Sequence, residues 1–310
     1  MTIRNRRMFS WALALSLALL PVAGRAQLAG LPAVESGGWV IRLIRMERSG
    51  SQYGEYTFTL SAQPRDGGPE RQLRLRNETT GLQRLEVVGD RLVVFGEVAG
   101  AGDQVSILEL ATGKLSSSFL CRGPELSPKR RYLAFRAYYP RFADPQATSD
   151  VLVLVDLSAA GPPVARPVFP PENAASGQAG SWVEKESERH AIEPMARYRF
   201  DAAESRLAFV DRVNDELWLV VLRLDRGEPR AVHRSRLDLS SALAISATDP
   251  ATAAAFEQER RNAAIEDLTF RDDRTIVLRL SRERWASERF YRSNQLVVNL
   301  DDANEAGAAP

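Results

Sequence analysis

The sequence of 310 residues contains one cysteine and two histidines. Cys121 has no second cysteine to pair with, so no disulfide can form within the chain and the fold must depend on its hydrophobic core. A lone cysteine of this kind is usually buried and unreactive. His190 and His233 have no partner histidine at helical or hairpin spacing, which disfavours a metal site. We therefore expect no metal ion and no other cofactor.

The sequence also lacks the short motifs that accompany common reactions. It has no Gly-x-Ser-x-Gly segment for a serine nucleophile and no glycine-rich phosphate loop. The pairs Asp272-Asp273 and Asp301-Asp302 lack the ligand spacing of a calcium loop, so we interpret them as turns. His190 follows a charged stretch that is typical of a solvated loop, and His233 falls in a predicted outer strand. No catalytic residue is predicted.

Lysine is scarce too, because only Lys114, Lys129 and Lys185 occur among 41 basic residues, which leaves 38 arginines. These arginines are interspersed with 40 acidic residues. Without the four arginines of the N-terminal segment, 37 basic residues stand against 40 acidic ones. Such a balance gives no overall attraction to a polyanion, so nucleic acid is not an expected partner.

The N-terminal segment, residues 1–26, has the features of a cleavable export signal. Arginines precede an apolar run over residues 8–20, which Pro21 ends. Gly24-Arg25-Ala26 supplies small residues for cleavage before Gln27. The run is short for a membrane span, which needs about 20 apolar residues, although an uncleaved anchor is the alternative. Arg6-Arg7 allows the twin-arginine route besides general secretion.

The mature chain is therefore expected in the periplasm, with an extracellular location as the alternative, and without a membrane span. The mature chain, residues 27–310, has about 284 residues, which suffices for one large domain or two smaller ones, and we expect residues 27–302 to form a single domain. Residues 303–310 have the composition of a frayed, disordered tail.

Two phrases in the middle of the sequence resemble each other, ELSPKRRYLAF at residues 125–135 and FDAAESRLAF at residues 200–209. Their Val, Leu, Ile and Phe runs between Gly, Pro, Asp and Ser are typical of strands. The same order of turn, strand, loop and strand fits four segments, residues 85–110, 126–157, 200–224 and 268–300. A strand at residues 39–46 and a hairpin around the turn at residues 64–69 precede them.

These repeats predict an all-β fold of about five units with three or four strands each. Units of this size and order favour a β-propeller of about five blades, with closure of the ring left open. The first unit lacks an evident innermost strand and the last an outermost one, and residues 28–36 are a candidate for completing the ring. The alternative is a β-sandwich or paired antiparallel sheets, which need no repeated order.

The best unit, LSPKRRYLAF followed by VLVLVDL, resembles the blade repeat of TolB-like β-propellers. Lys129-Arg130 replaces the Asp-Gly of that family's pattern, and the copy at residues 200–209 has Asp-Ala-Ala-Glu in the same place. The resemblance covers about half of the chain, and it implies a non-catalytic exported protein that binds a partner. The matching residues are Ser127, Pro128, Leu133, Ala134, Phe135, Asp156 and Leu157.

The sequence outside the repeats predicts where a partner binds. A four-stranded meander places two kinds of connection on the same face of the fold. These are the loop between its second and third strands and the connection to the next unit. The long insertions, residues 136–150, 170–194, 236–264 and 281–293, all fall in these positions. Loops gathered on one face of a rigid scaffold commonly carry binding function. Asp249-Pro250 and the alanine-rich run that follows predict a short helix in the third insertion.

Aromatic and arginine side chains in two of these insertions are the candidate binding residues, because these types are enriched at interaction hot spots. We expect a protein or an envelope polymer as the partner. The candidates are Tyr138, Tyr139, Arg141, Phe142, Arg282, Arg284, Trp285, Arg289 and Tyr291.

The alternative function is a propeller-type hydrolase or lyase that acts on glycans with carboxylates around the central channel. Glu86, Glu125, Asp201 and Asp267 lie near predicted first strands. Their positions along these strands do not converge on a pair, so we favour the non-catalytic binding protein.

Overall fold

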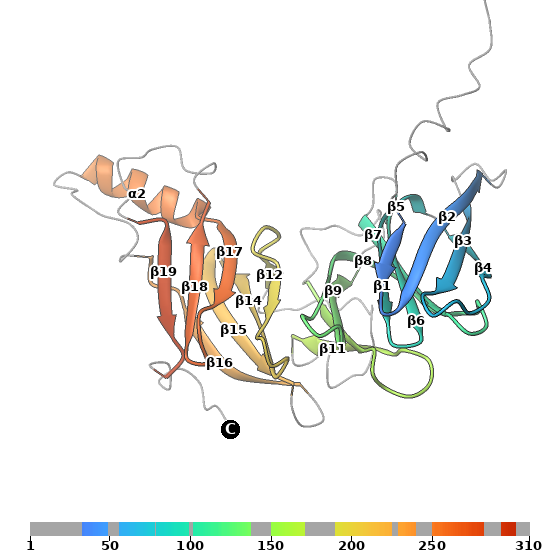
Figure 1. Ribbon diagram of the computed structural model, residues 1–310. Helices are drawn as coiled ribbons and strands as arrows, with labels where there is room; N and C mark the ends of the chain where they lie inside the picture. Colours follow the sequence, from blue (N-terminus) through green and yellow to red (C-terminus); the bar gives the residue numbers. More distant parts are fainter. Residues whose placement is uncertain are drawn as a thin grey trace, which may run out of the picture.

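The computed structural model of the chain describes residues 33–48, 56–77, 79–98, 102–137, 150–170, 190–224, 229–239, 250–281 and 293–301. These residues form antiparallel sheets and one helix, α2 (Pro250–Asn262), as Figure 1 shows. The all-β class and the short helix in the third insertion are therefore confirmed.

The first sheet is a four-stranded meander and forms the first blade. Its innermost strand, β1, is only three residues long, and Gly37 in the turn after it approaches Val87 of the second blade. A Cβ atom at Gly37 would lie 2.7 Å from Val87 Cγ1, so this turn needs glycine, whose positive φ of 55° also favours it. The strands are β1 (Val34–Ser36), β2 (Trp39–Arg48), β3 (Tyr56–Pro64) and β4 (Arg71–Asn77).

The second and third blades share one strand, which the sequence did not predict. β8 pairs with β7 up to Cys121 and with β9 from there on, so the seven strands form one sheet. Gly123 has a φ of 57°, and a register shift between Arg122 and Glu125 bends β8 there. The strands are β5 (Thr79–Val88), β6 (Arg91–Val98), β7 (Gly102–Glu109), β8 (Leu115–Leu126), β9 (Tyr132–Ala137), β10 (Leu152–Asp156) and β11 (Ala165–Phe169).

The fourth blade has an interrupted inner strand, since β12 and β13 both pair with β14, at opposite ends of it. The fifth blade has three strands among the described residues. The strands of the fourth blade are β12 (His190–Ile192), β13 (Tyr198–Phe200), β14 (Arg206–Val213), β15 (Glu216–Arg223) and β16 (Arg230–Arg236). Those of the fifth are β17 (Ile265–Phe270), β18 (Thr275–Leu280) and β19 (Gln295–Asn299).

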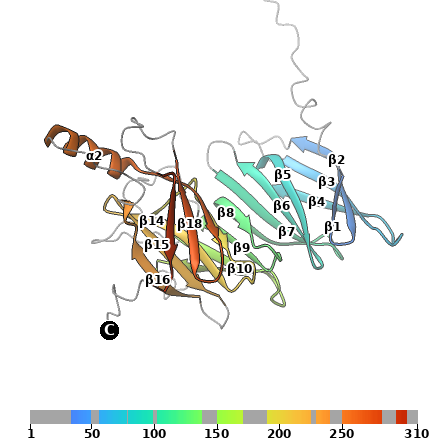
Figure 2. The same cartoon turned by 60° about the vertical axis from the view of Figure 1, so that its left-hand side comes forward.

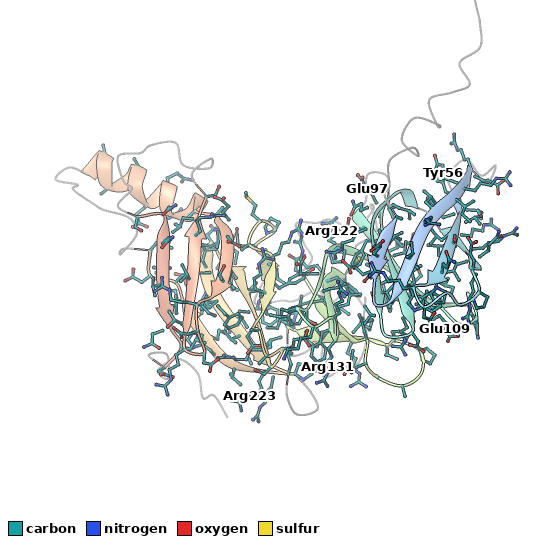
Figure 3. The ribbon with its side chains drawn as sticks, in the orientation of Figure 1. Tyr56, Glu97, Glu109, Arg122, Arg131 and Arg223 are labelled. Atoms are coloured by element: carbon teal, nitrogen blue, oxygen red, sulfur yellow. The ribbon has the colours of Figure 1, made fainter. Side chains whose placement is uncertain are left out.

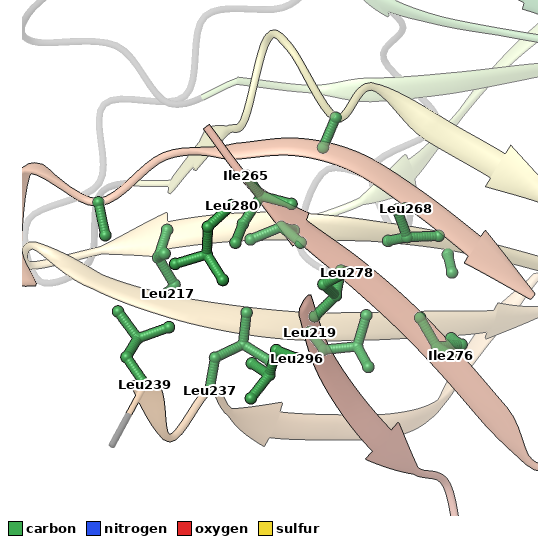
Figure 4. Close-up of a cluster of buried hydrophobic side chains, with 14 of the residues drawn as sticks. Leu217, Leu219, Leu237, Leu239, Ile265, Leu268, Ile276, Leu278, Leu280 and Leu296 are labelled. Atoms are coloured by element: carbon green, nitrogen blue, oxygen red, sulfur yellow. The ribbon is translucent and has the colours of Figure 1, made fainter. Parts of the chain in front are cut away.

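Four buried clusters join the five blades in chain order. Alternate residues of one strand face opposite neighbours, so Leu92 and Val94 pack toward the first blade while Val93 and Phe95 pack toward the third. In the same way, Phe209 packs toward the third blade and Val210 toward the fifth. Figure 4 shows the last cluster, between the fourth and fifth blades.

This face-to-face stacking of consecutive meanders is that of a β-propeller. In the view of Figure 1 the blades form a row, with β4 and β19 at opposite ends. Within the described parts of the chain, no buried cluster joins the first blade to the fifth. The described chain is thus an open propeller of five blades, and β1 supplies the inner strand that the first unit was expected to lack.

The two repeated phrases form the same turn by the same bonds. Ser127 Oγ accepts a hydrogen bond from the Tyr132 amide at 2.9 Å, and Asp201 Oδ1 accepts one from the Arg206 amide at 3.0 Å. Arg130 and Glu204 occupy the turn position that favours glycine, with φ of 63° and 62°.

Asp201 shows how strongly this turn is bonded. Burial alone would raise the pKa of the Asp201 carboxyl, but hydrogen bonds from Ser205 and Arg206 outweigh burial and lower it. A lowered folded-state pKa stabilises the fold above the ordinary aspartate range, and this contribution is lost as the pH falls through the folded value.

The loops alternate between two ends of the blades. Figure 3 places Glu97, at the end of β6, near the upper end of the molecule, and Glu109, at the end of β7, near the lower end. Arg131, which follows the repeated turn, lies near the lower end as well. The tight turns are therefore below, and the connections between second and third strands leave above.

Candidate functional site

All nine predicted binding residues lie outside the described part of the chain, in residues 138–149 and 282–292. The structure describes the residues on which these insertions begin and end, here called the roots of the insertions. The bonds among the roots show whether the insertions leave the scaffold together.

The roots of residues 138–149 and 171–189 are bonded to each other. The Ala137 amide donates to Val151 O at 2.9 Å, and the Asp150 amide donates to His190 O at 2.8 Å. The Asp150 carboxylate accepts from the Ile192 amide at 2.9 Å and from the Arg136 guanidinium at 3.3 Å. β9, β10 and β12 therefore meet at one point, where two insertions leave.

Arg212 of β14 joins the same region to the third insertion. Its guanidinium donates to Glu193 Oε1 at 2.8 and 3.0 Å, immediately after β12. It also donates to Arg261 O at 2.8 Å and to Ala263 O, at the end of α2. Because Glu193 is 5% exposed, this ion pair is largely removed from water and fixes the helix end firmly.

The root of the fourth insertion is bonded to the residue that follows the third. The Ser281 amide donates to Ala264 O at 2.9 Å, and Ser281 is the last described residue before residues 282–292. Hydrogen bonds thus connect the roots of all four long insertions, from Ala137 to Ser281. These insertions leave at one end of the third, fourth and fifth blades.

The polar centre of the roots is a buried histidine–aspartate pair. His190 Nδ1 lies 2.6 Å from Asp211 Oδ2, and the two residues are 3% and 0% exposed. The Phe169 ring packs edge-on against the imidazole. The interpretation of His190 as a solvated loop histidine is therefore wrong, because pairing with Asp211, 21 residues away, buries it in β12.

Asp211 Oδ1 is buried without a hydrogen-bond partner among the described residues. The pair lies at the end of the apolar cluster between the third and fourth blades, on the side of Phe209. At this exposure the imidazole is not accessible to a substrate. Its chemistry is that of a charge-assisted bond that holds β12 on β14.

The helix α2 stands out from the scaffold at the same end (Figure 1). Every α2 side chain whose exposure is described is exposed, including Glu257 and Gln258. A helix of this length is only marginally stable alone in water, and none of its described side chains is buried.

The carboxylates considered for glycan chemistry lie on or next to inner strands, but each is engaged by arginine. Glu86 lies 3.0 Å from Arg130, Glu125 lies 3.6 Å from Arg197, and Asp267 lies 3.3 Å from Arg199, all across blade boundaries. Asp201 binds Arg206 of its own blade at 3.1 Å. These contacts account for the four acids as links within and between blades.

Cys121 and His233 are both buried, and neither belongs to the roots. Burial, with Asp103 nearby, raises the pKa of the Cys121 thiol far above its usual range, so the thiol is unreactive as expected. Burial lowers the pKa of His233, which lies in the outer strand β16 and bonds Ser235 at 2.8 Å. No group of three or more potential ligands among the described side chains is arranged for a metal ion.

No protein-family model matches the sequence, and no curated protein matches it. Solved structures similar to the chain include a puromycin-hydrolyzing peptidase of Mycobacterium tuberculosis, 14% identical, with a TM-score of 0.36 over 84% of this chain and 36% of that one. The β-propeller domain of the trilobed protease of Pyrococcus furiosus is 9% identical, with a TM-score of 0.22 over 87% and 97%.

TolB of Acinetobacter baumannii is 13% identical, with a TM-score of 0.19 over 77% of this chain and 62% of that one. The chain spans about a third of the length of the peptidases it matches, 36% for the mycobacterial enzyme and 35% for a prolyl endopeptidase. Among the described helices, none is long and apolar enough to cross a membrane.

Proposed function

We propose that the chain is an exported, non-catalytic β-propeller that binds a protein or an envelope component through the insertions at one end of its blades. The observation that carries this proposal is the set of hydrogen bonds between the roots, from Ala137 through Asp150 and Arg212 to Ser281. A scaffold that fixes four insertions at one end gives a partner a broad surface with preset geometry.

Three further features favour binding over catalysis. The exposed helix α2 extends this end, and the TolB-like pattern of the third blade is that of exported binding proteins. Each of the four carboxylates on or next to the inner strands forms an ion pair with an arginine, which disfavours a role for it in glycan hydrolysis. The N-terminal segment has the features of an export signal, which supports the proposed location in the periplasm.

The test is affinity capture from an envelope extract with the Tyr139→Ala/Trp285→Ala variant. Removing two aromatic anchors from a binding surface lowers affinity by about tenfold or more for each, so the variant should lose the partner that the wild type captures. Quantitative mass spectrometry of the captured proteins and polymers provides the measurement.

The control is Thr112→Ala, which removes an exposed side chain from the β7–β8 turn at the opposite end. This variant should capture the partner as the wild type does. Equal recovery with all three proteins would sink the proposal, as would loss with Thr112→Ala alone.

A further inference from the structure

The first blade has one sheet face that no described strand covers. Its inner face packs through Ile41, Phe58 and Leu60 onto the second blade. Because β1–β4 stand first in the row of blades (Figures 1 and 2), the other side of this sheet faces away from the rest of the described molecule. We call this side the outer face of the first blade.

Strand register identifies the side chains of the outer face, because directly opposite residues of antiparallel neighbours point to the same side of a sheet. Opposite residues of β2, β3 and β4 form sets of three across the sheet, here called rows. Each row has a hydroxyl residue of β3 in the middle and long polar side chains of β2 and β4 beside it. The rows are Arg42, Ser61 and Gln72; Arg45, Thr59 and Arg74; and Glu47, Thr57 and Arg76.

A bulge in β2 is responsible for part of this arrangement. The register shifts between Leu43 and Arg45, so that Arg45 lies opposite Thr59. Without the shift, strand alternation would direct Arg45 to the inner face, away from Arg42. The bulge therefore brings the Arg45 guanidinium onto the outer face, together with that of Arg42.

The outer face has an excess of positive charge in a chain that is almost neutral overall. All four arginines are exposed, whereas Thr59 and Ser61 are only 9% and 2% exposed. Two carboxylates accompany them, since Glu47 pairs with Arg45 at 2.6 Å and Glu70 accepts from the Ser61 hydroxyl. Within the described chain, Arg42 and Arg74 have no ion-pair partner.

The spacing suits a ligand with repeated negative charges. Arg45 and Arg74 stand two strands apart, about 10 Å, and Arg74 and Arg76 are two residues apart on β4, about 7 Å. Guanidinium groups bind carboxylate, sulfate and phosphate oxygens in a fork, and Gln72 and Thr57 offer neutral hydrogen bonds for hydroxyl groups.

The chemistry of the face also narrows the class of ligand. The three rows contain no aromatic residue on which a nucleic-acid base could stack. Two apolar residues border the rows, Val40 opposite Gln63 and Ile44 in the bulge, where it is 52% exposed. Isolated aliphatic side chains among arginines are unlike the aromatic cluster of a protein hot spot. We propose that the outer face of the first blade binds an acidic polysaccharide, with Arg42, Arg45 and Arg74 contacting its anionic groups.

The test measures binding of the full chain to dextran sulfate, with uncharged dextran of the same length as the reference. The wild-type protein should bind dextran sulfate and should not bind dextran. The Arg42→Gln/Arg74→Gln variant should bind about tenfold more weakly, and its affinity should fall less steeply with salt because fewer counterions are released. The Arg42→Lys/Arg74→Lys variant keeps the charge without the fork and should lie between the two.

The matched control, Arg166→Gln/Arg230→Gln, removes two exposed arginines from the outer strands β11 and β16. It should bind like wild type. If Arg166→Gln/Arg230→Gln weakens binding of dextran sulfate as much as Arg42→Gln/Arg74→Gln does, the proposal is contradicted. The polymer would then be attracted to exposed arginines in general. Binding to duplex DNA or to anionic vesicles that is tighter and equally dependent on Arg42 and Arg74 would overturn the choice of ligand. None of these variants touches the insertions, so this result is independent of the proposed function.

Discussion

Replacing Phe209 with alanine is expected to lower the free energy of unfolding by about 3–5 kcal/mol. Phe209 is 0% exposed, and its ring packs edge-on against Phe169 of the third blade, with the centroids 4.9 Å apart. The substitution leaves a cavity in the cluster that joins the third and fourth blades. Urea denaturation of wild type and variant, followed by tryptophan fluorescence, measures the difference.

Leu120→Ala is the control for this prediction, because Leu120 is a large apolar side chain that is 40% exposed on β8. Its effect should be within about 0.5 kcal/mol, as for most surface substitutions. If Phe209→Ala costs no more than Leu120→Ala, the third and fourth blades are not packed through this cluster.

Replacing Arg212 with methionine is expected to cost about 3–5 kcal/mol as well, for an electrostatic reason. The substitution leaves the Glu193 carboxylate buried without its cation and frees the carbonyls of Arg261 and Ala263 at the end of α2. An unpaired charge in such surroundings is much less favourable than a buried pair. Chemical denaturation gives the change in stability, and hydrogen exchange at residues 261–264 reports the release of the helix end.

Two further variants separate the charge from the rest of the side chain. The double variant Arg212→Met/Glu193→Gln removes both charges and should recover part of the lost stability. Arg236→Met breaks an exposed pair with Glu216, 3.1 Å long, and should cost no more than about 1 kcal/mol. A double variant no more stable than Arg212→Met alone would show that the unpaired charge is not the cause.

Local sequence signals were sufficient for most of the strands. Runs of Val, Leu and Phe between turn residues predicted the strands around Phe135 and Phe209, and an Asp-Pro start followed by alanines predicted α2. These features depend on neighbours in the sequence. The turn bonds of Ser127 and Asp201 explain why two phrases of different composition form the same structure.

Features that depend on distant partners could not be predicted in this way. The Gly123-Pro124 step in β8 has the composition of a strand end, yet a bulge lets the strand continue into the third blade. His190 follows charged residues, and only its pairing with Asp211 across the blade shows that it is buried. The outer face of the first blade depends on a bulge between Leu43 and Arg45, which shifts Arg45 by one position.

The insertions themselves were placed correctly relative to the strands, because loop position in a meander follows from strand order alone. What they bind was not predicted beyond the class of partner, and the nine candidate residues lie outside the described chain. The hydrogen bonds among their roots, from Ala137 to Ser281, are the basis for inferring that the insertions act together.

Site-specific photo-crosslinking tests most directly whether the insertions act as one binding surface. A photoreactive residue is placed at Tyr139, at Trp285 or, as the reference, at Thr112 on the opposite end, and each protein is illuminated in an envelope extract. We expect the same partner to be crosslinked from positions 139 and 285 and not from 112. A partner crosslinked from 112 alone, or unrelated partners from 139 and 285, would contradict a shared binding end.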